Sequence, residues 1–288
     1  MLCILEQAAG PSIPGACFYC ASLPVPVVRI EVCPEHTHRV WFSKMKIKKS
    51  HSSVAKTVAI IPAGGSGTRM GSDRAKQFLD LCGKPILSVT LQPFQLCPAV
   101  DAIILVVPSK DVDYCRKEII ERFKLDKIKN VVVGGKTRQD SVRNGIEATG
   151  GDYGLVLIHD GVRPLIDETF IERVIEAAKS HRAVITGLPA METVKEVNDR
   201  REVVKTYNRC KVWLIQTPQV FRYKDILTAH QRAIQKGWEE ATDDSILIEK
   251  LGIPVTVIEG SEKNIKVTTP DDLKMARFFL GWRRDNDL

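Results

Sequence analysis

The chain has 288 residues, of which 44% are hydrophobic, 27% charged and 6% aromatic, so its composition is that of an ordinary globular protein. This composition excludes disorder throughout, a collagen-like repeat and a disulfide-stapled mini-fold, and no apolar run approaches the ~18 to 20 residues of a membrane-spanning helix. The net charge of +7 owes +4 to four lysines between positions 46 and 56, so residues 57–288 are nearly neutral, and we expect neither a nucleic-acid nor a membrane partner.

Residues 1–55 are predicted to be an N-terminal extension, mostly disordered or arising from an upstream start site. Met45 opens a Met-Lys-Ile-Lys-Lys stretch that suits a translation start, and the segment lacks the basic n-region of a secretory signal. An alternative is a zinc site, for which four side chains have nearly the right spacing: Cys17, Cys20, Cys33 and His36. Against zinc, the segment is rich in proline and glycine and has almost no periodic apolar pattern. The remaining cysteines are scattered, which favours a reducing compartment and predicts a cytoplasmic protein.

From about residue 56 the sequence alternates between short β-branched runs and segments with helical periodicity. Strands are predicted at Thr57–Ile61, Ala102–Val107, Val131–Val133, Leu155–Ile158, Ala183–Thr186, Lys211–Ile215 and Val255–Ile258. Helices are predicted at Pro85–Leu96, Val112–Arg122, Arg138–Ala148, Glu168–Lys179, Lys224–Lys236, Asp243–Leu251 and Pro270–Phe279. Because strand and helix alternate and the strands are almost wholly apolar, the pattern predicts an α/β fold: a mostly parallel sheet with helices on both faces.

The pattern also predicts where the domain begins and ends. We expect one domain over residues 56–281, followed by a C-terminal tail over 282–288. The last helix has a clear start, with Thr269 as N-cap and Asp272 three residues later. Residues 189–211 are polar, alternating and poor in helix signals, which predicts a projecting β-arm.

The loop after the first predicted strand carries the strongest chemical signal. It reads Pro-Ala-Gly-Gly-Ser-Gly-Thr-Arg-Met over residues 62–70, and its glycines allow backbone N–H groups to approach phosphate oxygens. A dinucleotide fingerprint fails because Met70 replaces its last glycine. A Walker A loop fails because Gly67-Thr68-Arg69 stands where that motif has Gly-Lys followed by serine or threonine. Arg69 and the nearby Lys76 make a simple tight turn the weaker interpretation.

With Lys-Gln-Phe-Leu at 76–79, this loop resembles the signature of the cytidylyltransferases that act on 2-C-methyl-D-erythritol 4-phosphate in the non-mevalonate isoprenoid pathway. The resemblance continues, in the family's order, through blocks at 134–142, 159–164, 216–219, 242–244 and 264–268. It covers about residues 56–281 and implies a Rossmann-like nucleotidyltransferase fold. It also implies an enzyme that uses CTP as co-substrate and a divalent cation, Mg²⁺, to join a cytidylyl group to a polyol phosphate.

For the CTP half of the reaction, the resemblance implies that Arg69 and Lys76 stabilise charge on the transferring phosphate. The nucleotide would be bound by residues of three loops: Ala63, Gly64, Gly65, Gly135, Arg138, Ser141, Asp160 and Gly161. Asp160 follows an apolar strand, where it could hold ribose hydroxyls or face the Mg²⁺ that the CTP phosphates mainly bind. The neighbouring His159 is interpreted as a hydrogen-bonded structural histidine.

For the second substrate, the resemblance implies that Thr193, Arg209 and Lys266 hold the polyol phosphate, with Arg163 and Thr217 nearby. A phosphate nucleophile repels the triphosphate that it attacks, so cations such as Arg209 and Lys266 are needed to neutralise and aim it. Thr193 and Arg209 lie in the predicted arm. In the family this arm reaches across a homodimer, so we expect a homodimer here.

Two other functions stay open at this point. One is a cytidylyltransferase for another polyol phosphate such as ribitol 5-phosphate, because those relatives share the Ala63-Gly64-Gly65 sequence. The other is a nucleotide-binding module without turnover. Such a module would have no need for four cations in the family's positions: Arg69, Lys76, Arg209 and Lys266.

Overall fold

The computed structural model describes residues 56–65, 75–238 and 241–286. The predicted N-terminal extension and the four candidate zinc ligands within it lie outside these residues. In the described ranges, no group of three or more His, Cys, Asp or Glu side chains is arranged to hold a metal ion. No helix in the same ranges is both long and apolar enough to cross a membrane.

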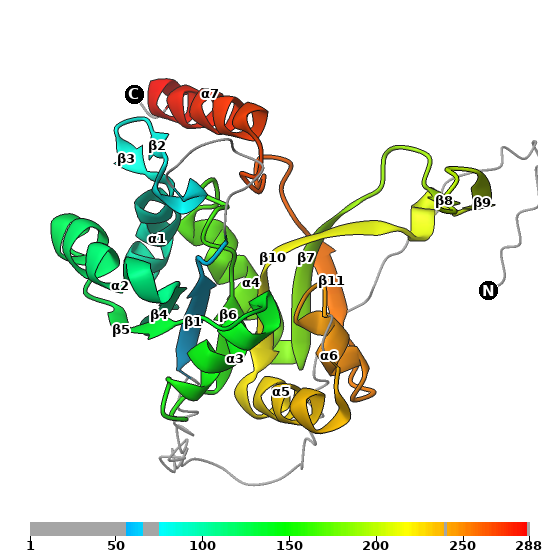
Figure 1. The fold of residues 1–288 in the computed structure, drawn as a ribbon, viewed down its shortest axis with the longest axis horizontal. Coiled ribbons are helices and arrows are strands. Elements are labelled where there is room, and N and C mark those ends of the chain that lie inside the picture. Colours follow the sequence, from blue (N-terminus) through cyan, green and yellow to red (C-terminus); the bar gives the residue numbers. More distant parts are fainter. Residues whose placement is uncertain (1–55, 66–74, 239–240, 287–288) are drawn as a thin grey trace, which may run out of the picture. The chain divides into compact units, whose positions relative to one another are not determined.

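A seven-stranded sheet forms the centre of the fold, in the order β11-β7-β10-β6-β1-β4-β5 (Figure 1). Its strands are β1 (Thr57–Pro62), β4 (Ala102–Val107), β5 (Ile128–Val133), β6 (Leu155–Ile158), β7 (Ala183–Pro189), β10 (Trp213–Arg222) and β11 (Thr256–Glu259). Strands β6, β1, β4 and β5 run parallel to one another, as β7 and β11 do, whereas β10 is antiparallel to both of its neighbours. The predicted mostly parallel sheet is therefore confirmed, with one antiparallel strand that the pattern did not indicate.

Strand β10 differs most from its predicted bounds. The apolar run predicted a strand that ends at Ile215, but the strand continues to Arg222. Its register against β7 shifts between Gln216 and Gln219, around Pro218, which has no N–H to give to the ladder. These polar residues interrupt the apolar pattern, so the sequence alone hides the buried second half of the strand.

Helices cover both faces of the sheet, as predicted. The structure has α1 (Ile86–Leu96), α2 (Val112–Tyr114), α3 (Arg138–Glu147), α4 (Glu168–Ser180), α5 (Tyr223–Lys236), α6 (Ser245–Glu249), α7 (Pro270–Asn286) and the π-helix η4 (Cys115–Glu121). On one face, α1, η4 and α4 pack against residues such as Ala59 and Ile61 of β1. On the other face, α3, α5 and α6 pack against Val58 and Ile60. This alternation is what a strand buried on both faces requires.

Two helices depart from their predictions. The single helix predicted over Val112–Arg122 is split into α2 and the π-helix η4. Helix α7 continues past Phe279 to Asn286, through most of the predicted tail. Its predicted start is confirmed: the Thr269 N–H donates to Asp272 Oδ2 at 2.8 Å, and the Asp272 N–H donates to Thr269 Oγ1 at 3.2 Å.

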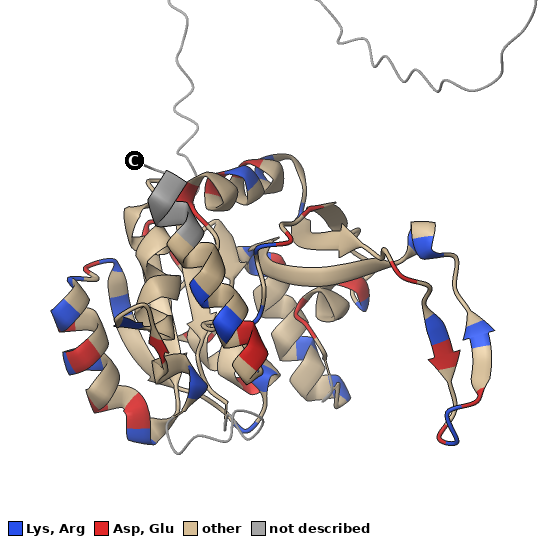
Figure 2. Ribbon diagram, turned by 90° about the horizontal axis from the view of Figure 1, so that it is seen from above, with Lys and Arg blue, Asp and Glu red and all other residues tan. Residues whose placement is uncertain are grey.

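The predicted β-arm projects from the sheet as a hairpin of β8 (Lys195–Val197) and β9 (Val203–Thr206) (Figure 1). Seen from above, β8 carries an acidic and a basic residue and β9 a basic one (Figure 2). Its apolar side chains Val197, Val203 and Val204 are more than half exposed. A second short hairpin, which the sequence did not indicate, joins β2 (Asp80–Leu81) to β3 (Lys84–Pro85) beside α7.

Candidate active site

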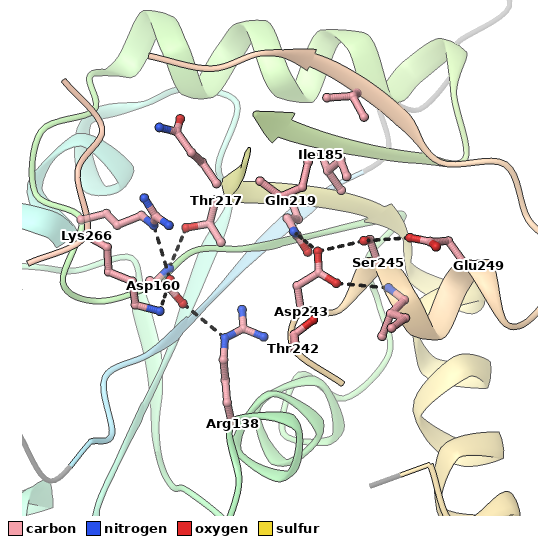
Figure 3. Close-up of a pocket in the computed structure, with 15 residues that line it drawn as sticks. Arg138, Asp160, Ile185, Thr217, Gln219, Thr242, Asp243, Ser245, Glu249 and Lys266 are labelled. Atoms are coloured by element: carbon pink, nitrogen blue, oxygen red, sulfur yellow. Dashed lines mark hydrogen bonds and ion pairs between the residues drawn. The ribbon is translucent and has the colours of Figure 1, made fainter. Parts of the chain in front are cut away.

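Five of the predicted site residues converge on one cavity of about 540 Å³ (Figure 3). Arg138 comes from the first turn of α3, Asp160 from the loop after β6, and Thr217 from the middle of β10. Arg163 lies three residues after Asp160, and Lys266 lies in the loop between β11 and α7. Because the loops that follow parallel strands meet at one edge of the sheet, residues more than 100 positions apart in the sequence line one site.

Asp160 lies at the centre of this group and contacts three cations. Its Oδ2 is 2.9 Å from Lys266 Nζ and 3.4 Å from Arg163 Nε, and its Oδ1 is 3.3 Å from Arg138 Nε. Burial alone would raise the pKa of this carboxyl, but Arg138, Lys266 and Arg163 outweigh burial and hold the pKa well below its usual range. Asp160 is therefore ionised at any pH at which the protein works.

Arg138 joins Asp160 to a second buried carboxylate. Its Nη1 lies 2.6 Å from Asp244 Oδ2, and Asp244 is only 1% exposed. Burial would lower the pKa of the guanidinium, but Asp244 and Asp160 raise it above its ordinary value. Asp244 has a lowered pKa, since the nearby Arg138 and His230 outweigh its burial. Both partners therefore carry full charge, and the guanidinium is fixed in orientation by two acceptors.

His159 is a structural residue of the site, as the sequence predicted. Thr217 Oγ1 accepts a hydrogen bond from the Asp160 N–H at 3.1 Å, so its own hydrogen is free to donate to His159 Nδ1, also at 3.1 Å. His159 Nε2 then donates to the Arg163 carbonyl at 3.1 Å. This network assigns the neutral Nε2–H tautomer. Burial lowers the pKa of His159 to about 4, in agreement with that assignment.

The loop after β1 lies against the loop after β6. The Gly161 N–H donates to the Pro62 carbonyl at 3.0 Å, and a Cβ on Gly161 would lie 2.8 Å from the Cβ of Ala63. A glycine at 161 therefore allows the two loops to approach this closely. Gly64 and Gly65 are exposed, and a Cβ on Gly65 would lie 3.6 Å from Lys76 Cε, so the Lys76 side chain runs beside this loop.

The segment that leads into α3 is braced by its own side chains. Ser141 Oγ donates to the Thr137 carbonyl at 2.9 Å and accepts from the Gly135 N–H at 3.1 Å. Thr137 and Asp140 form a capping box at the start of the helix. A Cβ on Gly135 would overlap the Asp140 side chain, so only glycine fits there. The brace fixes the turn from which Arg138 points into the cavity.

Two of the predicted site residues lie on the arm and do not line this cavity. Thr193 and Arg209 are exposed on the arm, which projects from the sheet (Figure 1), and neither residue is among those that line the cavity. Arg209 Nη1 donates to the Met191 carbonyl at 2.7 Å, which ties together the two sides of the arm at its base. Arg69 lies outside the described residues.

The sequence did not indicate several groups that hold the site together. Asp244 fixes Arg138, and Asn264 donates from Nδ2 to the Thr217 carbonyl at 2.7 Å. Gln219 Nε2 donates to Asp243 Oδ2 at 2.8 Å across the same cavity (Figure 3). The blocks 242–244 and 264–268 were noticed, but each partner lies on a distant element, so no local spacing marked these contacts.

The arrangement is suited to binding phosphate groups. Three cations face one carboxylate at the edge of a sheet, and glycines leave the neighbouring backbone open to a ligand. One arginine guanidinium can bind two phosphate oxygens at once, and a lysine ammonium group acts as a point charge. Among the described residues no cysteine and no histidine lines the cavity, and the nearby His159 is neutral with both ring nitrogens hydrogen-bonded. The chemistry that this site supports is electrostatic stabilisation of charged oxygens.

Comparisons with known proteins agree with this chemistry. The family model described as 2-C-methyl-D-erythritol 4-phosphate cytidylyltransferase matches residues 57–282. A protein of that name from Syntrophus aciditrophicus is 48% identical over 225 residues, which cover 78% of this chain and 96% of the relative. One from Desulforamulus reducens is 46% identical over 223 residues, covering 77% of this chain and 95% of the relative.

Solved structures are similar over the same part of the chain. The 4-diphosphocytidyl-2C-methyl-D-erythritol synthase of Anaerococcus prevotii has a TM-score of 0.69 and 34% identity, and the match covers 79% of this chain and 99% of that one. The 2-C-methyl-D-erythritol 4-phosphate cytidylyltransferase of Francisella tularensis has a TM-score of 0.68 and 34% identity, over 78% and 100% of the two chains.

Proposed function

The chain belongs to the 2-C-methyl-D-erythritol 4-phosphate cytidylyltransferase family, and from this premise we propose that the cavity around Asp160 is where it carries out the family's reaction. The enzyme transfers the cytidylyl group of CTP to 2-C-methyl-D-erythritol 4-phosphate in the non-mevalonate pathway. The products are 4-diphosphocytidyl-2-C-methyl-D-erythritol and pyrophosphate. The observation that carries the proposal is the contact of Asp160 with three cations, Arg138, Arg163 and Lys266, at the edge of the sheet.

CTP is proposed to bind beside the cavity, along the loops after β1 and before α3. Arg138 and the braced turn at Gly135 and Ser141 bind the nucleotide, and Asp160 contacts its ribose or its metal. The backbone of the loop after β1, at Ala63, Gly64 and Gly65, is proposed to lie beside the phosphates, as is that of Gly161. Lys76, which runs beside Gly65, and Arg69, which lies outside the described residues, stabilise the charge that develops on the α-phosphate.

The polyol phosphate is assigned to the opposite side. Arg163 and Lys266 neutralise its phosphate, while Thr217 fixes the Asp160 backbone through its hydroxyl. Thr193 and Arg209 are proposed to come from the arm of a second copy, because neither residue lines this cavity in its own chain, whose arm projects from the sheet. The working protein is accordingly proposed to be a homodimer in which each arm completes the neighbouring site.

The reaction itself needs position and charge more than proton transfer. A phosphate oxygen of the methylerythritol phosphate forms a bond to the α-phosphorus of CTP, and the bond from that phosphorus to the bridging oxygen of the β-phosphate breaks. The electron pair leaves with pyrophosphate. Lys266 and Arg163 hold the nucleophile in line, and Lys76 and Arg69 bind the non-bridging oxygens more tightly as charge builds on them.

A divalent cation, Mg²⁺, is proposed to accompany CTP. The described cavity offers it one buried carboxylate, that of Asp160, and no cluster of three acidic or histidine side chains. This donor set fits a metal that keeps its waters and takes its other ligands from a triphosphate. When bound, the ion neutralises charge on the phosphates, and Asp160 is the residue that faces it.

A cytoplasmic location is proposed from the cysteines. Each of the four that the structure describes is a free thiol: Cys82, Cys97, Cys115 and Cys210. Unpaired thiols are typical of a reducing compartment. Residues 1–55 are proposed to be an extension that precedes the catalytic domain over 56–281, and they lie outside the region that matches the family model.

The test is product formation from CTP and Mg²⁺, followed by pyrophosphate release and by ³¹P NMR of the diphosphate product. Methylerythritol phosphate is compared with ribitol 5-phosphate under the same conditions. We expect a kcat/KM at least about tenfold higher for methylerythritol phosphate, because both acceptors carry the phosphate that the cations bind and the fit of the polyol decides between them. Equal rates with the two acceptors would contradict the assignment of the substrate, and absence of product with either would contradict the assignment of the cavity.

A further inference from the structure

Behind the site lies a buried histidine to which the reaction assigns no role. His230 is on the inward face of α5 and is 1% exposed. Neither of its ring nitrogens has a partner at hydrogen-bond distance. The charged group beside it is Asp244, whose Oδ1 lies 3.6 Å from His230 Nε2. A buried imidazole without partners is costly, so its place beside a carboxylate needs an explanation.

The contacts of Asp244 explain why a ring nitrogen lies at the position of His230 Nε2. Its Oδ2 is taken by Arg138 at 2.6 Å, and its other oxygen faces His230. The carboxylate is almost fully buried, so both oxygens need a donor or a positive charge if the group is to stay ionised. His230, on α5, places a ring nitrogen beside the Oδ1 side of the Asp244 carboxylate. The chain of contacts then runs from His230 through Asp244 and Arg138 to Asp160.

We propose that His230 is a positioning residue: it holds Asp244 in the orientation that keeps Arg138 directed at Asp160. The contact is made by Nε2, the ring nitrogen that lies 3.6 Å from Asp244 Oδ1. Arg138 has a long, rotatable side chain. When His230 holds the Asp244 carboxylate in one orientation, that carboxylate restricts the Arg138 guanidinium to a single arrangement. The proposal rests on the assignment of Arg138 to the CTP side of the cavity.

The first test compares His230→Leu with His230→Gln. Leucine fills the same apolar space but has no N–H group, whereas the glutamine amide places an N–H close to the position of Nε2. We expect His230→Leu to raise the KM for CTP roughly tenfold, because loss of the nitrogen 3.6 Å from Asp244 Oδ1 leaves Asp244, and through it Arg138, less restricted in orientation. The KM for methylerythritol phosphate stays within about twofold, and His230→Gln recovers most of the affinity for CTP.

The second test asks whether His230 acts through Asp244. Asp244→Asn is expected to raise the KM for CTP at least as much as His230→Leu does, and the double variant is expected to be no worse than Asp244→Asn alone. His181→Leu is the matched control, because that histidine is exposed and its ring hydrogen-bonds to Thr256 Oγ1, at 3.2 Å, away from the site. It is expected to leave both KM values unchanged.

The outcomes separate the two proposals. If the wild-type protein shows no cytidylyl transfer, the proposed function itself is contradicted. An active wild type with an unchanged KM for CTP in His230→Leu contradicts the role of His230, as does equal impairment in the leucine and glutamine variants, which would indicate packing alone. If His230→Leu does not fold, His230→Asn is compared with His230→Gln. The asparagine amide reaches only the Nδ1 position, so equal KM values for these two variants also overturn the proposal.

Discussion

Lys266 Nζ lies 2.9 Å from Asp160 Oδ2, although 106 residues separate the two in the sequence. The lysine side chain is 39% exposed and lines the cavity, while the carboxylate is buried. A phosphate that enters the cavity can therefore reach the ammonium group from its open side without breaking the ion pair. This geometry leads to the first prediction.

Lys266→Ala is predicted to raise the KM for methylerythritol phosphate and to lower kcat, with a combined loss in kcat/KM of about 10² to 10³, comparable to the loss of one oxyanion donor. The KM for CTP changes by less than about threefold, because Arg138 still contacts Asp160. Steady-state kinetics with each substrate varied in turn provide the measurement. Lys274→Ala, on the exposed face of α7, is the control; a loss confined to CTP would contradict the assignment.

Asp160→Asn is predicted to cost both activity and stability. The amide keeps the shape of the carboxylate but leaves Arg138, Arg163 and Lys266 close together without their shared anion. Removing one member of a buried ion-pair network typically costs about 3 to 5 kcal/mol. Chemical denaturation at pH 7 measures this loss in the free energy of unfolding. Since the carboxyl has a lowered pKa, its contribution is present above about pH 4 and is lost as the pH falls below that value.

His159 predicts a second pH dependence, at higher pH. Its pKa is about 4 in the folded chain against 6.5 as its ordinary value, so between these values the unfolded chain binds a proton that the folded chain does not. Stability therefore falls as the pH falls from 6.5 to 4, by about 3 kcal/mol at about 1.4 kcal/mol for each pH unit. Urea denaturation at several pH values in this range measures the free energy of unfolding. This free energy should change less with pH in His159→Gln than in the wild type. His181→Gln, at an exposed site, should keep the wild-type slope; identical slopes in all three proteins would refute the assignment of a neutral, buried His159.

The thiols are predicted to differ sharply in reactivity. Burial raises the pKa of Cys115 to about 12, and burial also raises the pKa of Cys97. Cys210 is exposed near the base of the arm. Alkylation of the native protein at pH 8, followed by peptide mass spectrometry, should therefore modify Cys210 within minutes and leave Cys97 and Cys115 unmodified until the protein is denatured. Rapid labelling of Cys115 in the native protein would contradict the packing of η4 against the sheet.

The sequence predicts most of the fold because burial on both faces leaves a strong local mark. Apolar runs such as Ala102–Val107 predicted the bounds of β4 without error, and the predicted strand over 155–158 is likewise β6. Strand β10 was cut short because Pro218 and its polar neighbours break the pattern, while its pairing with β6 and β7 depends on the tertiary fold. A local pattern has no information about such pairing.

The site divides in the same way. Asp160 could be predicted because a carboxylate directly after an apolar strand lies at the ligand-binding edge of a sheet, and Arg138 because the family's motif contains it. Asp244 and His230 were not predicted as site residues, since one lies 106 positions and the other 92 positions after Arg138 in the sequence. Their role depends on α3, α5 and α6 packing on the same face of the sheet.

The central claim is that the cavity around Asp160 is the site of transfer and that the arm of a second copy completes it. The most direct measurement is activity in mixtures of two variants, Arg209→Ala in the arm and Lys266→Ala in the cavity, each nearly inactive alone. After the two are co-expressed or allowed to exchange subunits, random pairing gives mixed dimers with one intact site, so activity should recover to roughly a quarter of the wild type. A mixture no more active than either parent would contradict the account, because each site would then draw both residues from one chain.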